Sequence, residues 1–119
     1  MIDRWMMVAG LAVLTLAGCA TNDPLPGEQM RLAEQALEQA RAVGATDELA
    51  ELKLAEDKYQ AAQAALSAEE NKQARQLAEQ AELDARLAEA KVLTRKSAEQ
   101  LAEQSKSINR LRKQLGEVQ

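Results

Sequence analysis

The sequence predicts an all-α fold: a short helical hairpin followed by one long, partly coiled-coil-like helix. Residues 28–119 contain no proline and only two glycines, Gly44 and Gly116. Strong helix formers (Ala, Leu, Glu, Gln, Lys and Arg) dominate this stretch. Its apolar residues recur at spacings of three and four, which is typical of amphipathic helices. Aromatic residues make up only 2% of the chain, so we expect the helices to pack through small side chains around a thin core.

Residues 1–18 are typical of a bacterial lipoprotein signal peptide. A short start, Met1–Arg4, precedes about thirteen mostly apolar residues, Trp5–Ala17. This length suits a signal peptide and is too short for a transmembrane helix, which needs about twenty residues. The run ends in a tetrad that resembles a lipobox: Leu16, Ala17, Gly18 and Cys19. We therefore expect cleavage before Cys19 and lipidation of its thiol.

Cys19 is the only cysteine of the chain, so it cannot form an internal disulfide. The lipobox resemblance implies a diacylglyceryl group on its sulfur and usually a third acyl chain on the new terminal amine. Two or more chains hold a protein stably on a membrane, and this covalent lipid is the only cofactor expected. Ala20 follows, where enteric-type lipoproteins kept at the inner membrane carry Asp. We expect a lipid anchor in the outer membrane of a Gram-negative bacterium, facing the periplasm, with the inner membrane as the alternative.

Residues 19–27 are predicted to form a flexible tether between the lipid and the helical domain, 28–119. Pro24, Pro26 and Gly27 are incompatible with a helix interior. The tether would let the folded domain stand away from the bilayer.

Breaks in the helical domain predict three helices. Gly44 is typical of a helix stop, and Thr46 or Asp47 would cap the next helix. Ser67 and Glu70 have the spacing of a capping box, so a further helix is expected to begin near them. The predicted helices are 28–43, 47–66 and 69–117.

The first two helices each carry one apolar stripe. The stripes are Ala33, Ala36, Ala40 and Val43, and then Leu52, Ala55, Tyr59, Ala62 and Leu66. Tyr59 is the only aromatic residue beyond the signal peptide. We expect its ring to pack between alanines with its hydroxyl at the edge, rather than to bind a ligand.

The long helix carries two stripes on nearly opposite faces. The first, called the alanine seam below, is Ala74, Ala78, Ala81, Ala85, Ala88 and Val92. The second, called the heptad seam, is Leu83, Leu87, Ala90, Thr94, Ser97, Leu101, Gln104, Ile108, Leu111, Leu115 and Val118. We expect the alanine seam to receive the helical hairpin.

The distal half of the heptad seam has no predicted partner within the chain. Two helices of about twenty residues cannot cover a helix roughly 70 Å long. We expect self-association there, or contact with a helix of another protein. The predicted interface is Leu101, Ile108, Leu111, Leu115 and Val118. The alternative is a solvated, partly frayed helix, because Thr94, Ser97 and Gln104 interrupt the seam.

The distal end of the chain is also basic. Residues 91–119 contain seven Lys or Arg and three Glu, a net charge of +4, although the whole chain carries −4. The cluster that could contact an anion, such as a peptidoglycan carboxylate, is Lys106, Arg110, Arg112 and Lys113. The alternative is that these cations only complement the helix dipole. Nucleic acid is not an expected partner, because aromatic stacking groups are missing.

No catalytic residues and no metal site are predicted. The chain has no histidine and no second cysteine, which excludes soft metal sites and a histidine-based triad. Glu69 with Glu70 is better explained as a first-turn pair favoured by the helix dipole. Other charges are expected to support the long helix as pairs, namely Glu82 with Arg86 and Glu103 with Lys106.

Three segments carry a resemblance to a family of bacterial proteins. They are Ala36–Ala45, Lys58–Ala62 and, above all, Ala74–Ala90. Around them, residues 34–101 resemble the Ala/Glu/Gln-rich domain of unknown function 4398. The resemblance implies an exported lipoprotein with a helical hairpin like a tetratricopeptide unit, and it brings no established activity. The chain departs from the family at Glu69–Asn71, where members tend to have Gly, Asp and an aromatic residue.

The sequence therefore predicts a non-enzymatic envelope lipoprotein that acts as a periplasmic spacer or adaptor through protein–protein contacts. A second hypothesis is a tether that binds peptidoglycan through the basic distal end. A third is an accessory subunit of an envelope enzyme or transport complex. Membrane attachment through Cys19 is common to all three.

Overall fold

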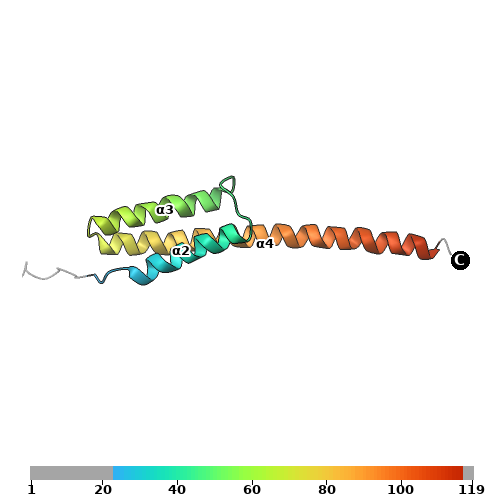
Figure 1. Ribbon diagram of the computed structural model, residues 1–119, viewed down its shortest axis with the longest axis horizontal. Coiled ribbons are helices and arrows are strands. Elements are labelled where there is room, and N and C mark those ends of the chain that lie inside the picture. The colour runs from blue at the N-terminus through green and yellow to red at the C-terminus, as the bar shows by residue number, and fades with distance from the viewer. Residues whose placement is uncertain (1–22, 117–119) are drawn as a thin grey trace, which may run out of the picture.

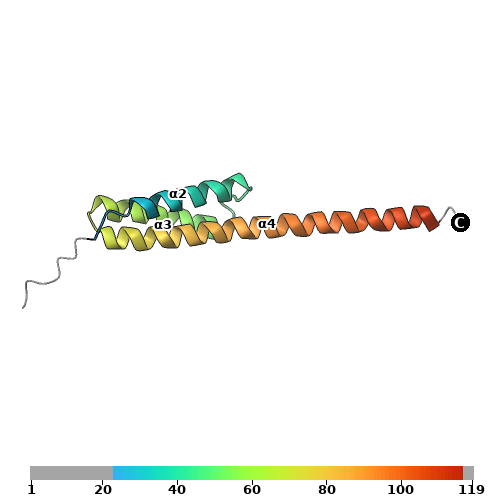
Figure 2. The ribbon, with the colours of Figure 1, turned by 90° about the horizontal axis from the view of Figure 1, so that it is seen from below.

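The computed structural model describes residues 23–116, which form three helices joined by short connections. Helix α2 spans Gly27–Ala42, α3 spans Ala50–Ser67 and α4 spans Asn71–Gly116. In the two views of Figures 1 and 2, α2 and α3 lie side by side along the first part of α4, and the rest of α4 extends alone. The all-α prediction, with a hairpin followed by one long helix, is confirmed.

Both short helices pack mainly on α4 rather than on each other. Helix α3 runs antiparallel to its two neighbours, because each connection reverses the chain after only a few residues (Figure 1). The core is built almost entirely of alanine. Its α4 part consists of Ala74, Ala78, Ala81, Ala85, Ala88 and Val92, all at most 2% exposed. These residues are the predicted alanine seam, and their small side chains let the helix axes approach closely.

The hairpin contributes most of its predicted stripes to this core. Ala33, Ala36 and Ala40 of α2 are buried as expected. Leu37 is also buried, although the predicted stripe did not include it, whereas Val43 of that stripe is only partly buried. In α3 the buried residues are Leu52, Ala55, Ala62 and Ala65. Tyr59 and Leu66, which were expected on the same stripe, are only partly buried at the edge of the core.

Helix α2 ends in the way that the sequence predicts. Gly44 has a φ of +101°, and its N–H donates to the Arg41 carbonyl at 2.9 Å while the Ala45 N–H donates to the Ala40 carbonyl at 2.9 Å. This pair of bonds is a Schellman motif, in which the left-handed position suits glycine. Ala45 is then buried against the core.

The predicted start of the second helix is wrong. Thr46 and Asp47 do not cap it; instead the Leu49 N–H donates to the Thr46 carbonyl at 2.8 Å in a turn. Helix α3 begins at Ala50, three residues later than expected, without a side-chain cap. The turn brings partly buried Leu49 against the core, and this burial outweighs the local capping preference.

The predicted capping box at Ser67 is also wrong. Ser67 lies in the last turn of α3, where its hydroxyl donates to the Gln63 carbonyl at 2.9 Å. The helix ends in a second Schellman motif, with the Glu69 N–H bonded to the Leu66 carbonyl and the Glu70 N–H to the Ala65 carbonyl. Glu69 is therefore left-handed, with a φ of +61°, and α4 begins only at Asn71.

Replacing Glu69 by glycine should stabilise the protein by about 1 kcal/mol, because glycine adopts a positive φ without the steric cost that a side chain carries. Urea denaturation would measure the gain in the free energy of unfolding. Glu69→Ala is the matched control, since it removes the same carboxylate but keeps the strain. An equal gain from both variants would assign the effect to charge and contradict the conformational explanation.

The segment before α2 makes contacts with the helical domain that the predicted flexible tether would not make. The Asn71 side-chain amide donates to the Asp23 carbonyl at 3.0 Å, and Pro26 is among the largest fully buried side chains. Asp23 is therefore held at the start of α4, whereas Leu25 is exposed, and α2 begins directly after Pro26 at Gly27. The remainder of the predicted tether, residues 19–22, lies outside the described part of the chain.

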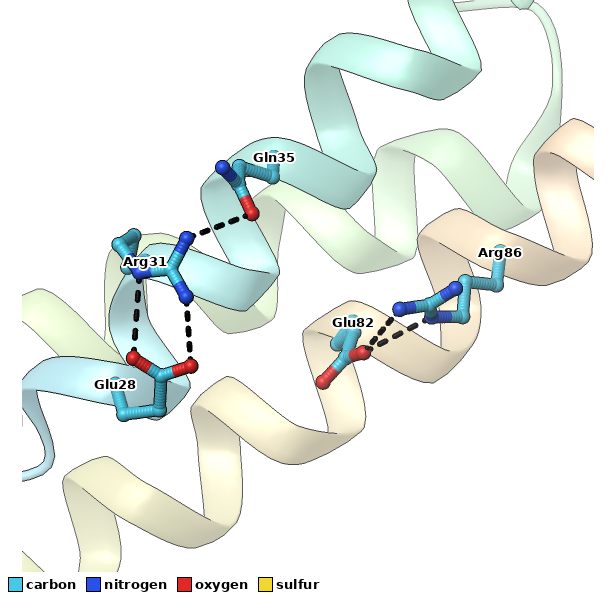
Figure 3. Close-up of polar contacts among 5 residues, drawn as sticks. All are labelled: Glu28, Arg31, Gln35, Glu82 and Arg86. Carbon is cyan, nitrogen blue, oxygen red and sulfur yellow. Dashed lines mark hydrogen bonds and ion pairs between the residues drawn. The ribbon is translucent and has the colours of Figure 1, made fainter.

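Surface charge pairs support the helices without organising the core. The predicted pair Glu82–Arg86 is present at 2.7 Å, and Glu103–Lys106 is present at 3.8 Å. Figure 3 shows Glu82–Arg86 together with a similar set on α2, in which Arg31 bonds both Glu28 and Gln35. Such exposed pairs contribute only tenths of a kcal/mol each.

Three ion pairs join different helices. Lys58 of α3 lies 2.6 Å from Asp84 of α4, and Arg41 of α2 lies 2.5 Å from Glu56 of α3. Lys91 of α4 donates to Glu51 of α3, and this hydrogen bond lowers the pKa of that carboxyl. Two of these pairs join α3 to α4 and one joins α2 to α3, whereas the alanine seam supplies most of the buried contact.

Candidate functional site

The second half of α4 extends beyond the rest of the described protein (Figures 1 and 2). Val92 is its last buried residue, and the last cross-helix contact is the Lys96 ammonium, which donates to the Val43 carbonyl at 2.6 Å. Residues 97–116, called the distal segment below, are exposed throughout apart from Ser107, which is partly exposed. This segment rises roughly 30 Å at 1.5 Å per residue.

Large apolar side chains on the distal segment face solvent. Leu101 is 64% exposed, Ile108 49%, Leu111 57% and Leu115 72%. Their spacing of seven, three and four residues places them on one face of the helix. They are the described members of the predicted partner interface, whose fifth member, Val118, lies outside the described residues. A single helix gains little stability from its backbone alone, and this stripe has no cover from the rest of the described chain.

The same face continues toward the body of the protein. Leu83 is 67% exposed and Leu87 is 47% exposed, although both lie where α2 and α3 pack on α4. The hairpin covers the alanine seam instead, on the other side of the helix. The heptad seam is therefore uncovered along its whole described length, from Leu83 to Leu115.

The predicted basic cluster divides between two faces. Lys106, Arg110 and Lys113 are spaced by four and three residues, so they share the face opposite the apolar stripe. Arg112 lies at the edge of the stripe. All four side chains are exposed, and the distal segment is thus amphipathic, with an apolar face and a basic face.

Tyr59 lies in a shallow groove of about 280 Å³ between α2 and α3. The groove is bordered by Glu34, Glu38 and the Arg41–Glu56 ion pair. Burial, followed by the negative charge of Glu34, raises the pKa of Tyr59, so its hydroxyl stays protonated at neutral pH. Its ring packs against both clusters of the core, which agrees with the predicted packing role.

Two structural contacts were not anticipated from the sequence. Asn71 anchors residue 23, and Lys96 closes the end of α2 through the Val43 carbonyl. Each joins residues about fifty positions apart, and no local pattern signals such a contact. Both lie at the ends of the hairpin, where they hold its position on α4.

Metal-binding groups and membrane-spanning helices are not seen in residues 23–116. This part of the chain has no group of three or more residues that could hold a metal ion. None of its helices combines the length and the hydrophobicity needed to cross a bilayer. The predicted lipidation motif, Leu16, Ala17, Gly18 and Cys19, lies outside the described residues.

Comparison with known proteins adds a family and a solved structure. The model of a domain of unknown function (DUF4398) matches residues 28–104. The crystal structure of a DUF4398 family protein (PA2901) from Pseudomonas aeruginosa PAO1 is similar, with 73% sequence identity and a TM-score of 0.78. The similarity covers 81% of this chain and 100% of that chain. No curated protein matches the chain.

Proposed function

The chain belongs to the DUF4398 family, and from this premise we propose that it is a non-enzymatic envelope lipoprotein that acts as a helical spacer or adaptor. Lipid on Cys19 holds one end in the outer membrane, and the distal segment contacts a protein partner in the periplasm. The observation that carries the proposal is the exposed apolar stripe of Leu101, Ile108, Leu111 and Leu115 on a helix that nothing else in the described chain supports.

The fold supports a spacer because the two functional ends are far apart. Residue 23 is held beside Asn71, at the start of α4, while the apolar stripe ends at Leu115. The helix between Asn71 and Leu115 rises roughly 66 Å at 1.5 Å per residue. A lipid attached a few residues before Asp23 would therefore place the membrane at one end of the rod and the contact surface at the other.

The packing mode also favours a binding role over catalysis. Catalytic acids and bases need enclosed, desolvated surroundings that shift their pKa values. The core of residues 23–116 buries no polar or charged side chain, and the groove at Tyr59 is open and lacks a nucleophile with a base beside it. We therefore assign the activity of the protein to contacts along α4.

Replacing Cys19 by alanine should abolish membrane retention. Cell fractionation would find the Cys19→Ala chain in the soluble fraction or as an unprocessed precursor, whereas the wild-type chain stays with the outer membrane. Intact mass spectrometry of the wild type should show loss of residues 1–18 and the added mass of acyl chains. A bare thiol with the leader still present, or normal retention of the variant, would contradict the proposed anchor.

A second candidate function, a peptidoglycan tether, is favoured by the exposed basic face of Lys106, Arg110 and Lys113. Purified cell wall separates the two functions, since a tether binds it at low salt and is released at high salt, while an adaptor does not bind. Lys106→Gln with Lys113→Gln should weaken tether binding. Lys53→Gln with Lys72→Gln removes the same charge from exposed positions on the body and serves as the control.

A further inference from the structure

We propose that the partner of the heptad seam is a second copy of this chain, paired in parallel and in register along α4 from Leu83 to Leu115. The inference deepens the proposed function by naming the partner. It rests on that function only for the shared orientation of two anchored chains, and its other arguments come from the described residues.

A second α4 can lie along the heptad seam without any rearrangement of the chain. The hairpin covers the alanine seam, and the heptad seam on the other side stays exposed from Leu83 to Leu115. A copy that lies along this seam displaces neither α2 nor α3, which remain on the outer sides of the pair. The seam spans about four and a half heptads, which is enough for a sustained coiled coil.

The positions of the polar residues within the seam favour a parallel pair in register. In a parallel, in-register pair, each seam residue meets the same residue of the copy. Gln104 then faces Gln104, so two amides can bond each other, and the layers of Leu101 and Ile108 stay wholly apolar. An antiparallel pair over the same span places Leu101 against Ser97 and Gln104 against Thr94. Polar and apolar seam residues are then mixed in one layer, whereas the parallel pair keeps each leucine and isoleucine layer free of polar groups.

The charge pattern beside the seam favours a second copy of the chain as the partner. Flanking positions select partners in coiled coils, because opposite charges there attract and like charges repel. The flanking positions of the distal segment are Ala98, Gln100, Ser105, Ser107, Arg112 and Gln114. Arg112 is the one charged residue among them. In the parallel pair Arg112 faces Ser107 of the copy, so no like charges meet in the distal segment. Nearer the body the flanking cations Arg86 and Lys91 face each other, but each already pairs with a carboxylate of its own chain, Glu82 and Glu51. A partner chosen by opposite charge would find almost nothing to bind in the distal segment.

The charges of the distal segment lie on its outer face instead. Two copies of a net basic helix would repel if their cations met at the interface. Lys106, Arg110 and Lys113 point away from the seam, with Glu99 and Glu103 among them. The segment can therefore pair with itself despite its net charge.

The position of the N-terminal segment also favours the parallel orientation. Residue 23 of each chain is held at the start of α4. A parallel pair brings both of these ends together, so two chains anchored through Cys19 can share one membrane. An antiparallel pair would place them at opposite ends of the rod.

Cysteine cross-linking of the full chain in its membrane tests the pairing. Leu101→Cys and Leu111→Cys, each alone, should give a disulfide-linked band at twice the monomer mass after mild oxidation. Ala102→Cys and Asn109→Cys lie on the outer face of the same stretch and should stay monomeric. An antiparallel pair over the same span would leave both seam variants monomeric, and a mixture of Leu101→Cys with Ser97→Cys would cross-link instead. That result, a link to a different protein, or equal linkage from the control positions would overturn the proposal.

Sedimentation of the purified full chain in detergent provides a second measurement. Ile108→Asp with Leu111→Asp should convert the dimer to monomer, because two carboxylates per chain enter the apolar interface. Ala102→Asp with Asn109→Asp adds two aspartates to the outer face and should leave the dimer intact. A monomeric wild type, or a dimer that survives the seam substitutions, would overturn the proposal.

Failure of the anchor would be visible separately in the same preparations. A wild-type chain that cross-links through Cys19, or whose Cys19 reacts with a maleimide, has a free thiol. That result contradicts the lipid anchor, while the contrast between seam and outer-face cysteines still decides the pairing.

Discussion

Leu52→Ala is expected to destabilise the protein by about 3 kcal/mol. Leu52 is 0% exposed and is one of the two largest fully buried side chains. Its neighbours in the core are mostly alanines of all three helices, among them Ala36, Ala55 and Ala85. Alanine side chains are too short to close the cavity that the substitution leaves, so the loss of buried area is not compensated. Urea denaturation of the two chains would measure the difference in the free energy of unfolding.

Leu54→Ala is the matched control for this prediction. Leu54 lies two residues along the same helix and is 46% exposed. It undergoes the same chemical change with the same small effect on helix propensity. We expect a loss of well under 1 kcal/mol, because surface substitutions rarely do more. Equal losses at both positions would show that the core does not depend on Leu52.

Ala85→Leu is expected to destabilise the docking of the hairpin by about 3 kcal/mol. Ala85 is 0% exposed in the middle of the alanine seam, where it packs against residues of α2 and α3. Leucine is almost as good a helix former as alanine, so α4 itself should persist. The larger side chain forces the helices apart and weakens every neighbouring contact. Urea denaturation would record the loss, and proteolysis should cleave α2 and α3 before α4.

Ala102→Leu makes the same exchange on the exposed outer face of the distal segment. It should leave the unfolding of the body unchanged, since no other element of the described chain contacts residue 102. A similar loss from both substitutions would indicate a general effect on α4 rather than crowding at the seam. Unchanged stability in Ala85→Leu would show that the three helices are packed loosely enough to admit a larger side chain.

The helices and their buried faces were predictable because both depend on local periodicity. The spacing of four and three residues from Ala74 to Val92 identified the alanine seam, and all six of its members are buried. The α2 stripe was predicted equally well at Ala33, Ala36 and Ala40. Small residues repeated on one helical face can only be buried against another helix, so this part of the fold follows from the pattern.

The connections were predicted less well because they depend on contacts made elsewhere. Ser67 and Glu70 have the spacing of a capping box, yet backbone bonds to Ala65 and Leu66 end α3 beyond Ser67. The family resemblance already carried a hint, since its members tend to have a glycine where this chain has Glu69. A left-handed residue at that position explains the preference, and the chain keeps the turn while accepting a strained glutamate.

The residues of the candidate site could be predicted from the sequence, but the point along α4 at which the exposed part begins could not. The heptad seam from Leu101 to Leu115 is visible as a pattern, and its side chains are exposed. The sequence does not show where the hairpin stops along α4. That point is set by the turn at Gly44 and by the Lys96 contact with Val43, which joins residues 53 positions apart.

The amino-acid sequence alone determined that this chain forms helices, that the long helix has two apolar faces, and that one of them is made of alanine. These properties follow from helix propensity and from the spacing of side chains around a helix, which act within a few residues. The same pattern also predicted that the hairpin covers the alanine face. Only the tertiary structure decided that this cover ends near Val92 and that Leu83 and Leu87 stay exposed beside it. Those outcomes depend on contacts between residues far apart in the sequence, such as Lys96 with Val43, which local periodicity does not encode.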